Sequence, residues 1–215
     1  APLFLASLTA AAATEESVLG AGDLVLRVNR EVGGHCSGFA LDATTVATAA
    51  HCLWLERPRA WIRPTSLHVL LGYDRGDYVQ HIRVTAYRIA AAYRADRGPG
   101  QASDWALLTL DRPLLGAVPT LAPVPALRGA AYAVGGFGAR RAHRAAWAVN
   151  CRATRVGPDR FAHSCPLAAG FSGGPVVGRR DGASMIFGLH IASDKTQGLA
   201  IPAAAIGQGE MRQPY

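Results

Sequence analysis

A serine set among glycines is the residue of this chain best suited to chemistry. Ser172 lies in the stretch Gly170-Phe171-Ser172-Gly173-Gly174-Pro175. Glycines permit a sharp turn that exposes the hydroxyl group, and they leave backbone N–H groups accessible to a developing oxyanion. The pattern is therefore typical of a nucleophilic serine, although a structural turn built of small residues fits it as well.

The same residues also match G-x-S-x-G, the nucleophile elbow of the α/β-hydrolases. In that fold the acid and then the histidine follow the serine, with alternating strands and helices between them. Of the 215 residues, only 43 follow Ser172, which is too few for such an arrangement. The α/β-hydrolase interpretation therefore fails.

Two other residues have the chemistry that a serine nucleophile needs. His51 lies in Thr48-Ala49-Ala50-His51-Cys52, where a disulfide beside the histidine would hold a general base in orientation. Asp104 directly precedes an apolar run, so its carboxylate is expected to be partly desolvated and to accept a hydrogen bond from an imidazole N–H. Taken singly, His51 could instead end a strand and Asp104 could simply occupy a turn.

The four cysteines predict two disulfides. None of them forms C-x-x-C, the usual spacing of zinc and redox sites, so no metal is expected. Four cysteines allow three connectivities, and we favour the two local pairs, Cys36 with Cys52 and Cys151 with Cys165. Disulfides imply an oxidising compartment, so we expect the protein to be secreted or periplasmic.

The N-terminal segment agrees with export. Residues 1–13 read like the apolar end of a signal peptide with small residues near a cleavage site, although an ordinary apolar helix also fits them. No other stretch is long and apolar enough to span a bilayer, so no stable membrane anchor is expected.

The composition is that of a globular protein with a basic surface. Hydrophobic residues make up 50% of the chain and charged residues 17%, enough apolar content for one large domain or two small ones. The net charge is +7, and arginine supplies all but one of the 22 positive side chains. No Lys/Arg run exceeds two residues, and no aromatic-rich basic motif occurs, so nucleic acid is not an expected partner.

Short apolar runs broken by Gly, Pro, Asp and Asn predict an all-β protein. A proline-rich stretch, residues 114–128, is expected to link an N-terminal half (18–113) to a C-terminal half (129–215), after a signal or pro-segment remnant (1–17). Pro202 is expected to begin a short C-terminal helix that ends at Ile206. Strands are expected at 24–28, 36–41, 44–48, 67–71, 79–89, 105–110, 131–134, 146–155, 160–165, 175–177, 184–191 and 198–201.

The chain resembles the chymotrypsin-like serine proteases over roughly residues 18–206, because T-A-A-H-C, D-W-A-L-L and G-F-S-G-G-P occur in the order His, Asp, Ser. The resemblance implies two packed six-stranded antiparallel β-barrels. It also implies that Ser172 is the nucleophile, His51 the general base and acid, and Asp104 the group that orients His51. The N–H groups of Gly170 and Ser172 would form the oxyanion hole, and Cys36–Cys52 would correspond to the family's bridge behind the histidine. Such an enzyme needs no cofactor, acts on polypeptide substrates and is expected to be a monomer.

Two departures from the family pattern carry information. Phe171 stands where many members have an aspartate that pairs with a new N-terminus after zymogen cleavage, so this activation switch is expected to be absent. Pro166, six positions before Ser172, stands where trypsin-type members have an aspartate. Cleavage after Arg or Lys is therefore not expected.

His190 suggests a different specificity. Together with Ser193 and Pro166 it is predicted to line the pocket for P1, the substrate residue before the cleaved bond. A histidine at this position resembles the bacterial glutamyl-endopeptidase branch and would favour an acidic P1 side chain. Residues 18–23 also loosely resemble the mature N-terminus of that branch. His190 could also be a structural strand residue. Two other functions compete with the peptidase: a catalytically inactive basic binding protein on the same fold, and an esterase-like acyl hydrolase.

Overall fold

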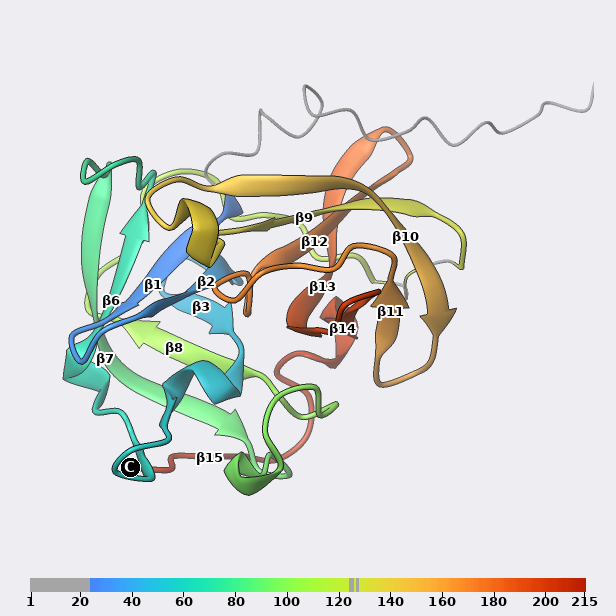
Figure 1. The fold of residues 1–215 in the computed structure, drawn as a ribbon. Helices are drawn as coiled ribbons and strands as arrows, with labels where there is room; N and C mark the ends of the chain where they lie inside the picture. The colour runs from blue at the N-terminus through green and yellow to red at the C-terminus, as the bar shows by residue number, and fades with distance from the viewer. Residues whose placement is uncertain (1–23, 124–125, 127) are drawn as a thin grey trace, which may run out of the picture.

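The computed structural model describes residues 24–123, 126 and 128–215. The predictions for residues 1–17 and 18–23 lie outside this part of the chain. Two β-barrels lie side by side, the first drawn from blue to green and the second from yellow to red (Figure 1).

The first barrel is built from six antiparallel strands in the order β7-β6-β1-β2-β3-β8, and the pairing of β7 with β8 closes it. A seventh short strand near the C-terminus, β15 (Met211–Arg212), pairs with β7 at its edge. The barrel strands are β1 (Leu26–Arg30), β2 (His35–Ala40), β3 (Thr45–Thr48), β6 (Leu67–Leu71), β7 (Gln80–Ala90) and β8 (Ala106–Leu110).

The second barrel is closed by six strands in the order β10-β11-β14-β13-β12-β9. The prediction of two six-stranded antiparallel barrels is therefore confirmed. Outside both barrels, β4 (Trp54–Leu55) and β5 (Ala60–Trp61) form a small hairpin. The barrel strands are β9 (Ala131–Gly136), β10 (Ala146–Val156), β11 (Phe161–His163), β12 (Pro175–Arg180), β13 (Ala183–Ser193) and β14 (Gly198–Pro202).

The predicted C-terminal helix is wrong. Pro202 ends β14, and only one 3-10 turn follows it, η6 (Ala203–Ala205). Ile206 has extended backbone, and Gly207 has a positive φ of 79°, which ends a helical segment before it can propagate. The other helical segments in the described ranges are also 3-10 turns: η2 (Ala50–Leu53), η3 (Pro64–Ser66), η4 (Ala95–Arg97) and η5 (Ala139–Arg141).

One apolar core runs from the first barrel into the second. Phe39 and Tyr87 of the first barrel belong to the same buried cluster as Leu189 and Ile201 of the second. Burying a side chain of this size stabilises the fold by about 1.5–3 kcal/mol. Separating the barrels would expose several such side chains and would cost several times this free energy. The residues that the two barrels contribute to a shared site are therefore held in fixed positions.

Both disulfides are those predicted, Cys36–Cys52 and Cys151–Cys165. The first connects β2 to the turn η2, and the second connects β10 to the segment after β11. Among the helical segments that the structure describes, none is long and apolar enough to cross a membrane.

Removal of the second disulfide should destabilise the protein without unfolding it. The bridge closes a loop of 14 residues, and the chain-entropy model assigns such a loop about 3 kcal/mol. We expect Cys151→Ala/Cys165→Ala to lower the free energy of unfolding by roughly this amount in urea titrations. An unchanged midpoint with an unchanged urea dependence would show that the bridge does not stabilise the fold.

Candidate active site

His51 and Asp104 form a buried pair in the first barrel. The Asp104 side chain is completely buried, and its Oδ2 lies 2.8 Å from His51 Nδ1. The carboxylate also accepts the backbone N–H of His51 at 2.9 Å and that of Gly100 at 3.2 Å. Three hydrogen bonds thus compensate a carboxylate that has lost its water.

This pairing fixes the orientation and the tautomer of His51. A carboxylate only accepts hydrogen bonds, so Nδ1 of His51 carries the proton of the neutral ring. Nε2 is then an unprotonated nitrogen, and the His51 side chain is 21% exposed, so a reacting group can reach it. The arrangement gives a base with one fixed nitrogen and one accessible nitrogen.

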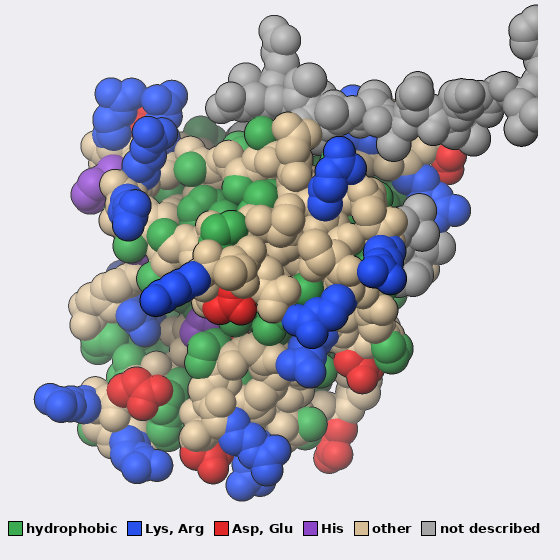
Figure 2. Space-filling model, turned by 45° about the vertical axis from the view of Figure 1, so that its right-hand side comes forward, with side chains coloured by type: hydrophobic (Ala, Val, Ile, Leu, Met, Phe, Trp, Pro, Cys, Tyr) green, Lys and Arg blue, Asp and Glu red, His purple; other side chains and the backbone are tan. Residues whose placement is uncertain are grey.

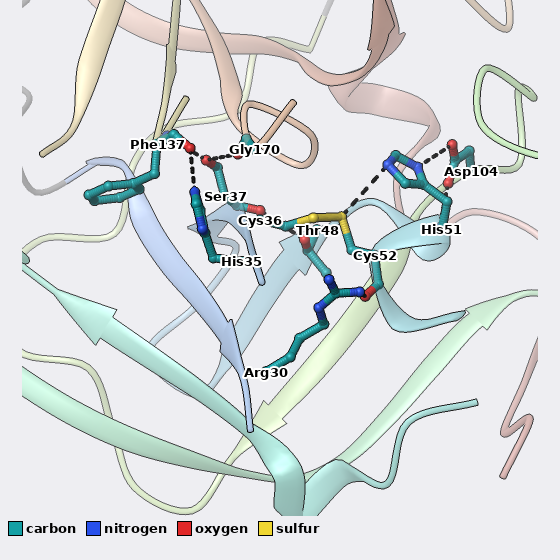
Figure 3. Close-up of a disulfide and its surroundings, with 10 residues drawn as sticks. All are labelled: Arg30, His35, Cys36, Ser37, Thr48, His51, Cys52, Asp104, Phe137 and Gly170. Atoms are coloured by element: carbon teal, nitrogen blue, oxygen red, sulfur yellow. Dashed lines mark hydrogen bonds and ion pairs between the residues drawn. A yellow bond between two sulfur atoms is a disulfide. The ribbon is translucent and has the colours of Figure 1, made fainter. Parts of the chain in front are cut away.

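The Cys36–Cys52 disulfide holds the histidine turn against the barrel. His51 lies in the 3-10 turn η2, directly after β3, and the next residue is bonded to Cys36 on β2. Figure 3 shows the bridge between the His51–Asp104 pair on one side and Ser37, Gly170 and Phe137 on the other. His51 Nε2 lies 3.8 Å from Cys52 Sγ. The bridge therefore ties the histidine turn to β2, the strand that also contacts the serine-bearing turn.

Ser37 fastens the serine turn of the second barrel to the first barrel. Its N–H donates to the carbonyl of Ser172 at 2.8 Å, and its Oγ donates to the carbonyl of Gly170 at 2.8 Å. The same Oγ accepts the N–H of Phe137 at 2.9 Å. One residue on β2 thus positions both residues that flank Phe171, Ser172 through its backbone N–H and Gly170 through its side chain.

Two glycines allow the serine turn to approach this closely. Gly173 has a φ of 84°, and a Cβ there would overlap the Ser37 carbonyl and the Thr48 hydroxyl. Gly170 has a φ of 97°, and a Cβ there would overlap the Phe137 carbonyl. Any larger residue at either position would push the turn away from β2 and β3. Between them, Phe171 is buried against Gly136 and Gly138 and anchors the turn.

The backbone of the turn leaves two donors without a protein acceptor. The N–H groups of Phe171, Gly173 and Gly174 donate to the carbonyls of Ala168, His190 and Phe171. Those of Gly170 and Ser172 donate to no acceptor within the described part of the chain. Unpaired N–H donors on both sides of Phe171 are the kind of group that an oxyanion hole uses.

The turn that carries Ser172 packs beside the histidine turn, without a hydrogen bond from Ser172 Oγ to His51 among the described residues. Ser172 is half-buried, and Gly173 packs against Ala49, two residues before His51. The hydrogen bonds among the described residues include none between Ser172 Oγ and His51 Nε2. In ligand-free hydrolases this contact is often long and shortens when substrate binds. The structure therefore brings His51 and Asp104 into contact, with Ser172 on the facing turn.

His190 lies in the second barrel, behind the serine turn. It is on β13 and 2% exposed, and its backbone pairs with Gly173 and Gly174. Its Nε2 lies 3.5 Å from Ser193 Oγ, which accepts the N–H of Leu167 at 3.0 Å. Pro166, the residue before Leu167, is exposed. His190 thus lies against the serine turn, and Ser193 Oγ connects it to the N–H of Leu167, the residue after Pro166.

His163, which lies in no motif of the sequence analysis, is a partner of His190. It is fully buried, and its Nε2 lies 3.1 Å from His190 Nδ1. Burial lowers the pKa of His163 to about 4. Burial, followed by the neighbouring His163 and His51, lowers the pKa of His190 well below its usual value. Both rings are therefore neutral near pH 7.

Neutrality and burial together indicate where the proton of His190 sits. His163 Nδ1 is buried without a hydrogen-bond partner, and an unpaired lone pair is less costly there than an unpaired N–H. His163 Nε2 then carries the proton and donates it to His190 Nδ1. His190 Nε2 consequently carries a proton as well, and this donor is the one beside Ser193 Oγ.

Two groups of histidine and cysteine side chains come within ligand distance of one another, but neither offers thiolates. They are Cys36, His51 and Cys52, and Cys151, His163 and Cys165. In both groups the two cysteines form a disulfide, so their sulfurs cannot bind a metal as thiolates do.

A family model described as a trypsin-like peptidase domain matches residues 36–185. The matched region contains His51, Asp104 and Ser172 but ends before His190. Among solved structures, "Structure of Glu endopeptidase in complex with MPD" matches with a TM-score of 0.71 and 17% identity, over 85% of this chain and 86% of that chain. At this identity the likeness concerns the fold. Comparison with curated proteins gave no significant match.

The buried His163 should make stability depend on pH. Its folded pKa of about 4 lies below the value of about 6.5 expected in the unfolded chain. Between these values the unfolded chain binds more protons, so stability is full above about pH 6.5 and falls as the pH drops toward 4. The slope is at most about 1.4 kcal/mol per pH unit for one such group. Urea unfolding between pH 7 and pH 4.5 should show a shallower slope for His163→Asn, and an identical slope would contradict the assignment.

Proposed function

Because this chain belongs to the trypsin-like peptidase family, we propose that it is a serine endopeptidase that cleaves peptide bonds through an acyl-enzyme. Ser172 is the nucleophile, His51 the general base and acid, and Asp104 the residue that orients His51. The observation that carries the proposal is the buried Asp104 carboxylate on His51 Nδ1, which leaves Nε2 free for proton transfer.

Each step of acyl transfer has a group in this site. His51 Nε2 takes the proton of Ser172 Oγ as that oxygen attacks the carbonyl carbon of the substrate. The carbonyl oxygen becomes an oxyanion and accepts hydrogen bonds from the unpaired N–H groups of Gly170 and Ser172. His51 then passes its proton to the leaving amine, and water repeats the sequence to release the acid from Ser172.

A second function is supported by different observations. A catalytically inactive basic binding protein on the same fold agrees with the net charge of +7 and with the missing Ser172–His51 hydrogen bond. It leaves the desolvated Asp104 carboxylate and the two unpaired N–H groups without a role. We therefore favour the peptidase over the binding protein.

Reaction with an active-serine phosphonate probe separates the two functions. We expect the wild type to be labelled and to cleave peptides, and Ser172→Ala to do neither while unfolding at the same temperature. Asp104→Asn should lower kcat on the order of 10⁴-fold, because the amide stabilises the wrong tautomer of His51. A correctly folded wild type that neither reacts nor cleaves would point to the binding protein instead.

We further propose that the pocket prefers an acidic P1 side chain. Burial keeps His190 neutral. Its Nε2–H, next to Ser193 Oγ, can donate a hydrogen bond to a substrate carboxylate. Pro166 supplies no acid that would attract Arg or Lys. The fold shared with a Glu endopeptidase agrees with this preference, although the family match ends before His190.

Matched peptides that differ only in Glu or Gln at P1 test the pocket. A hydrogen bond to a charged group contributes roughly 1.5–3 kcal/mol, so kcat/KM should favour Glu by about 10- to 100-fold. His190→Gln should reduce this preference, while the phosphonate probe should still label Ser172. Equal cleavage of both peptides by the wild type would leave the peptidase assignment intact and remove the acidic pocket.

The two disulfides support an extracytoplasmic location, either secreted or periplasmic. Polypeptides are the proposed substrates, without a metal, a cofactor or nucleic acid, and the proposed enzyme is a monomer.

A further inference from the structure

Positively charged side chains are spread over the face of the molecule seen in Figure 2 and gather most densely at its upper left. One group of arginines surrounds a hollow of about 410 Å³ between the turn η5 and the β6–β7 turn. Residues 139–144 and Arg75 line this "arginine hollow". All four of its arginines, Arg75, Arg140, Arg141 and Arg144, are exposed.

The arginine hollow has an excess of positive charge. Asp74 is near Arg75 at 3.3 Å and Arg144 at 3.9 Å, so one carboxylate is shared by two guanidinium groups. Asp77, whose backbone bonds to that of Asp74, is the other acid in the β6–β7 turn. Neither Arg140 nor Arg141 forms an ion pair among the described residues. These two cations are therefore available to an acidic ligand.

The loop that bears Arg140 and Arg141 is tied to the first barrel. The buried Arg27 donates to the carbonyl of Ala142 and lies over the rings of Tyr73 and Phe137. The N–H of Arg75 donates to the carbonyl of His143 at 2.6 Å. Because Arg27 and Arg75 hold the backbone of this loop in place, binding of a ligand need not order the loop.

The arginine hollow begins next to the candidate active site. Gly138 packs against the ring of Phe171, and the N–H of Ala139 donates to the carbonyl of Ala169 at 2.7 Å. Arg140 and Arg141 follow within one and two residues, or about 4–8 Å of chain. In Figure 1 this short gold turn lies over the β1–β2 side of the first barrel.

The direction of a bound substrate follows from the two flanks of the serine turn. The proposed P1 pocket is on the β13 flank, where Gly173 donates to the carbonyl of His190. With P1 on that flank and its carbonyl oxygen on the N–H groups of Gly170 and Ser172, the chain after the cleaved bond continues past the opposite flank. That flank is the one formed by Phe137 and Ala139.

Building on the proposed function, we infer that the arginine hollow binds acidic side chains in the leaving half of the substrate, at the first two or three residues after the cleaved bond. A strand advances about 3.3 Å per residue, so these positions reach Arg140 and Arg141. Guanidinium groups at an exposed site attract carboxylates by screened charge and by paired N–H donors. The preferred partner is an acidic polypeptide.

The test compares peptides with one fixed sequence up to the cleaved bond and either two Glu or two Gln residues after it. At low salt we expect kcat/KM to be about fivefold higher for the Glu peptide, because two exposed ion pairs contribute an effect of this size. The difference should shrink at 0.5 M NaCl, because a Debye length of roughly 4 Å screens exposed charges. Arg140→Gln/Arg141→Gln should abolish the preference. Arg179→Gln/Arg180→Gln, which removes the same charge at the β12–β13 turn, should retain it.

Binding of the leaving half alone separates this inference from the peptidase assignment. Fluorescence anisotropy of a labelled Glu peptide with Ser172→Ala should show binding that Arg140→Gln/Arg141→Gln weakens. If no peptide is cleaved but this dependence holds, the arginine hollow stands and the peptidase proposal fails. Equal cleavage and equal binding of the Glu and Gln peptides would overturn the inference. Tighter binding of a single-stranded oligonucleotide at the same two arginines would assign the hollow to nucleic acid and would also overturn it.

Discussion

The contact between the serine turn and strand β2 is the interaction on which the site depends. The first barrel provides the His51–Asp104 pair, and the second provides Ser172, so the proposed catalysis needs the barrels in one fixed relation. Ser37 supplies that relation through hydrogen bonds to the carbonyls of Ser172 and Gly170. The absence of a side chain at Gly173 lets the turn lie against Thr48 and Ala49. The buried apolar core is continuous between the barrels, and close-packed interiors yield little. The two barrels are therefore not expected to shift relative to each other at this contact.

The buried charge of Asp104 explains much of what surrounds the histidine. A carboxylate without water is tolerated only if its oxygens are fully hydrogen-bonded, and two of the three donors come from His51 itself. The histidine turn must therefore stay in register with Asp104, 53 residues away. The Cys36–Cys52 bridge fixes that turn to β2, the same strand that holds the serine turn. A single strand thus aligns the proposed base, His51, with the proposed nucleophile, Ser172.

The fold was largely predictable because short apolar runs between turn residues mark each barrel strand. The hairpin β4–β5 was missed because strands of two residues leave no periodicity, and the C-terminal helix was wrong because Gly207 ends it after one turn. His51, Asp104 and Ser172 could be proposed as site residues from the sequence because their motifs are local. Ser37 carries no such signal, since its role depends on a contact across 133 residues to Gly170. The pairing of His163 with His190 carries no local signal either, because it depends on strand register opposite Gly198, whose missing side chain makes room for the imidazole ring.

The two carboxylate sites proposed here rely on opposite physics. His190 is buried and neutral, so it would discriminate by one directed hydrogen bond in a medium that screens little, and its selectivity should change little with salt. Arg140 and Arg141 are exposed and always charged, so they would attract acids over a longer range, and salt should weaken that attraction. A basic surface of +7 suits the second role but contributes little to the first. The salt dependence of each subsite therefore reports which kind of recognition operates there, independently of how fast the peptide bond is cleaved.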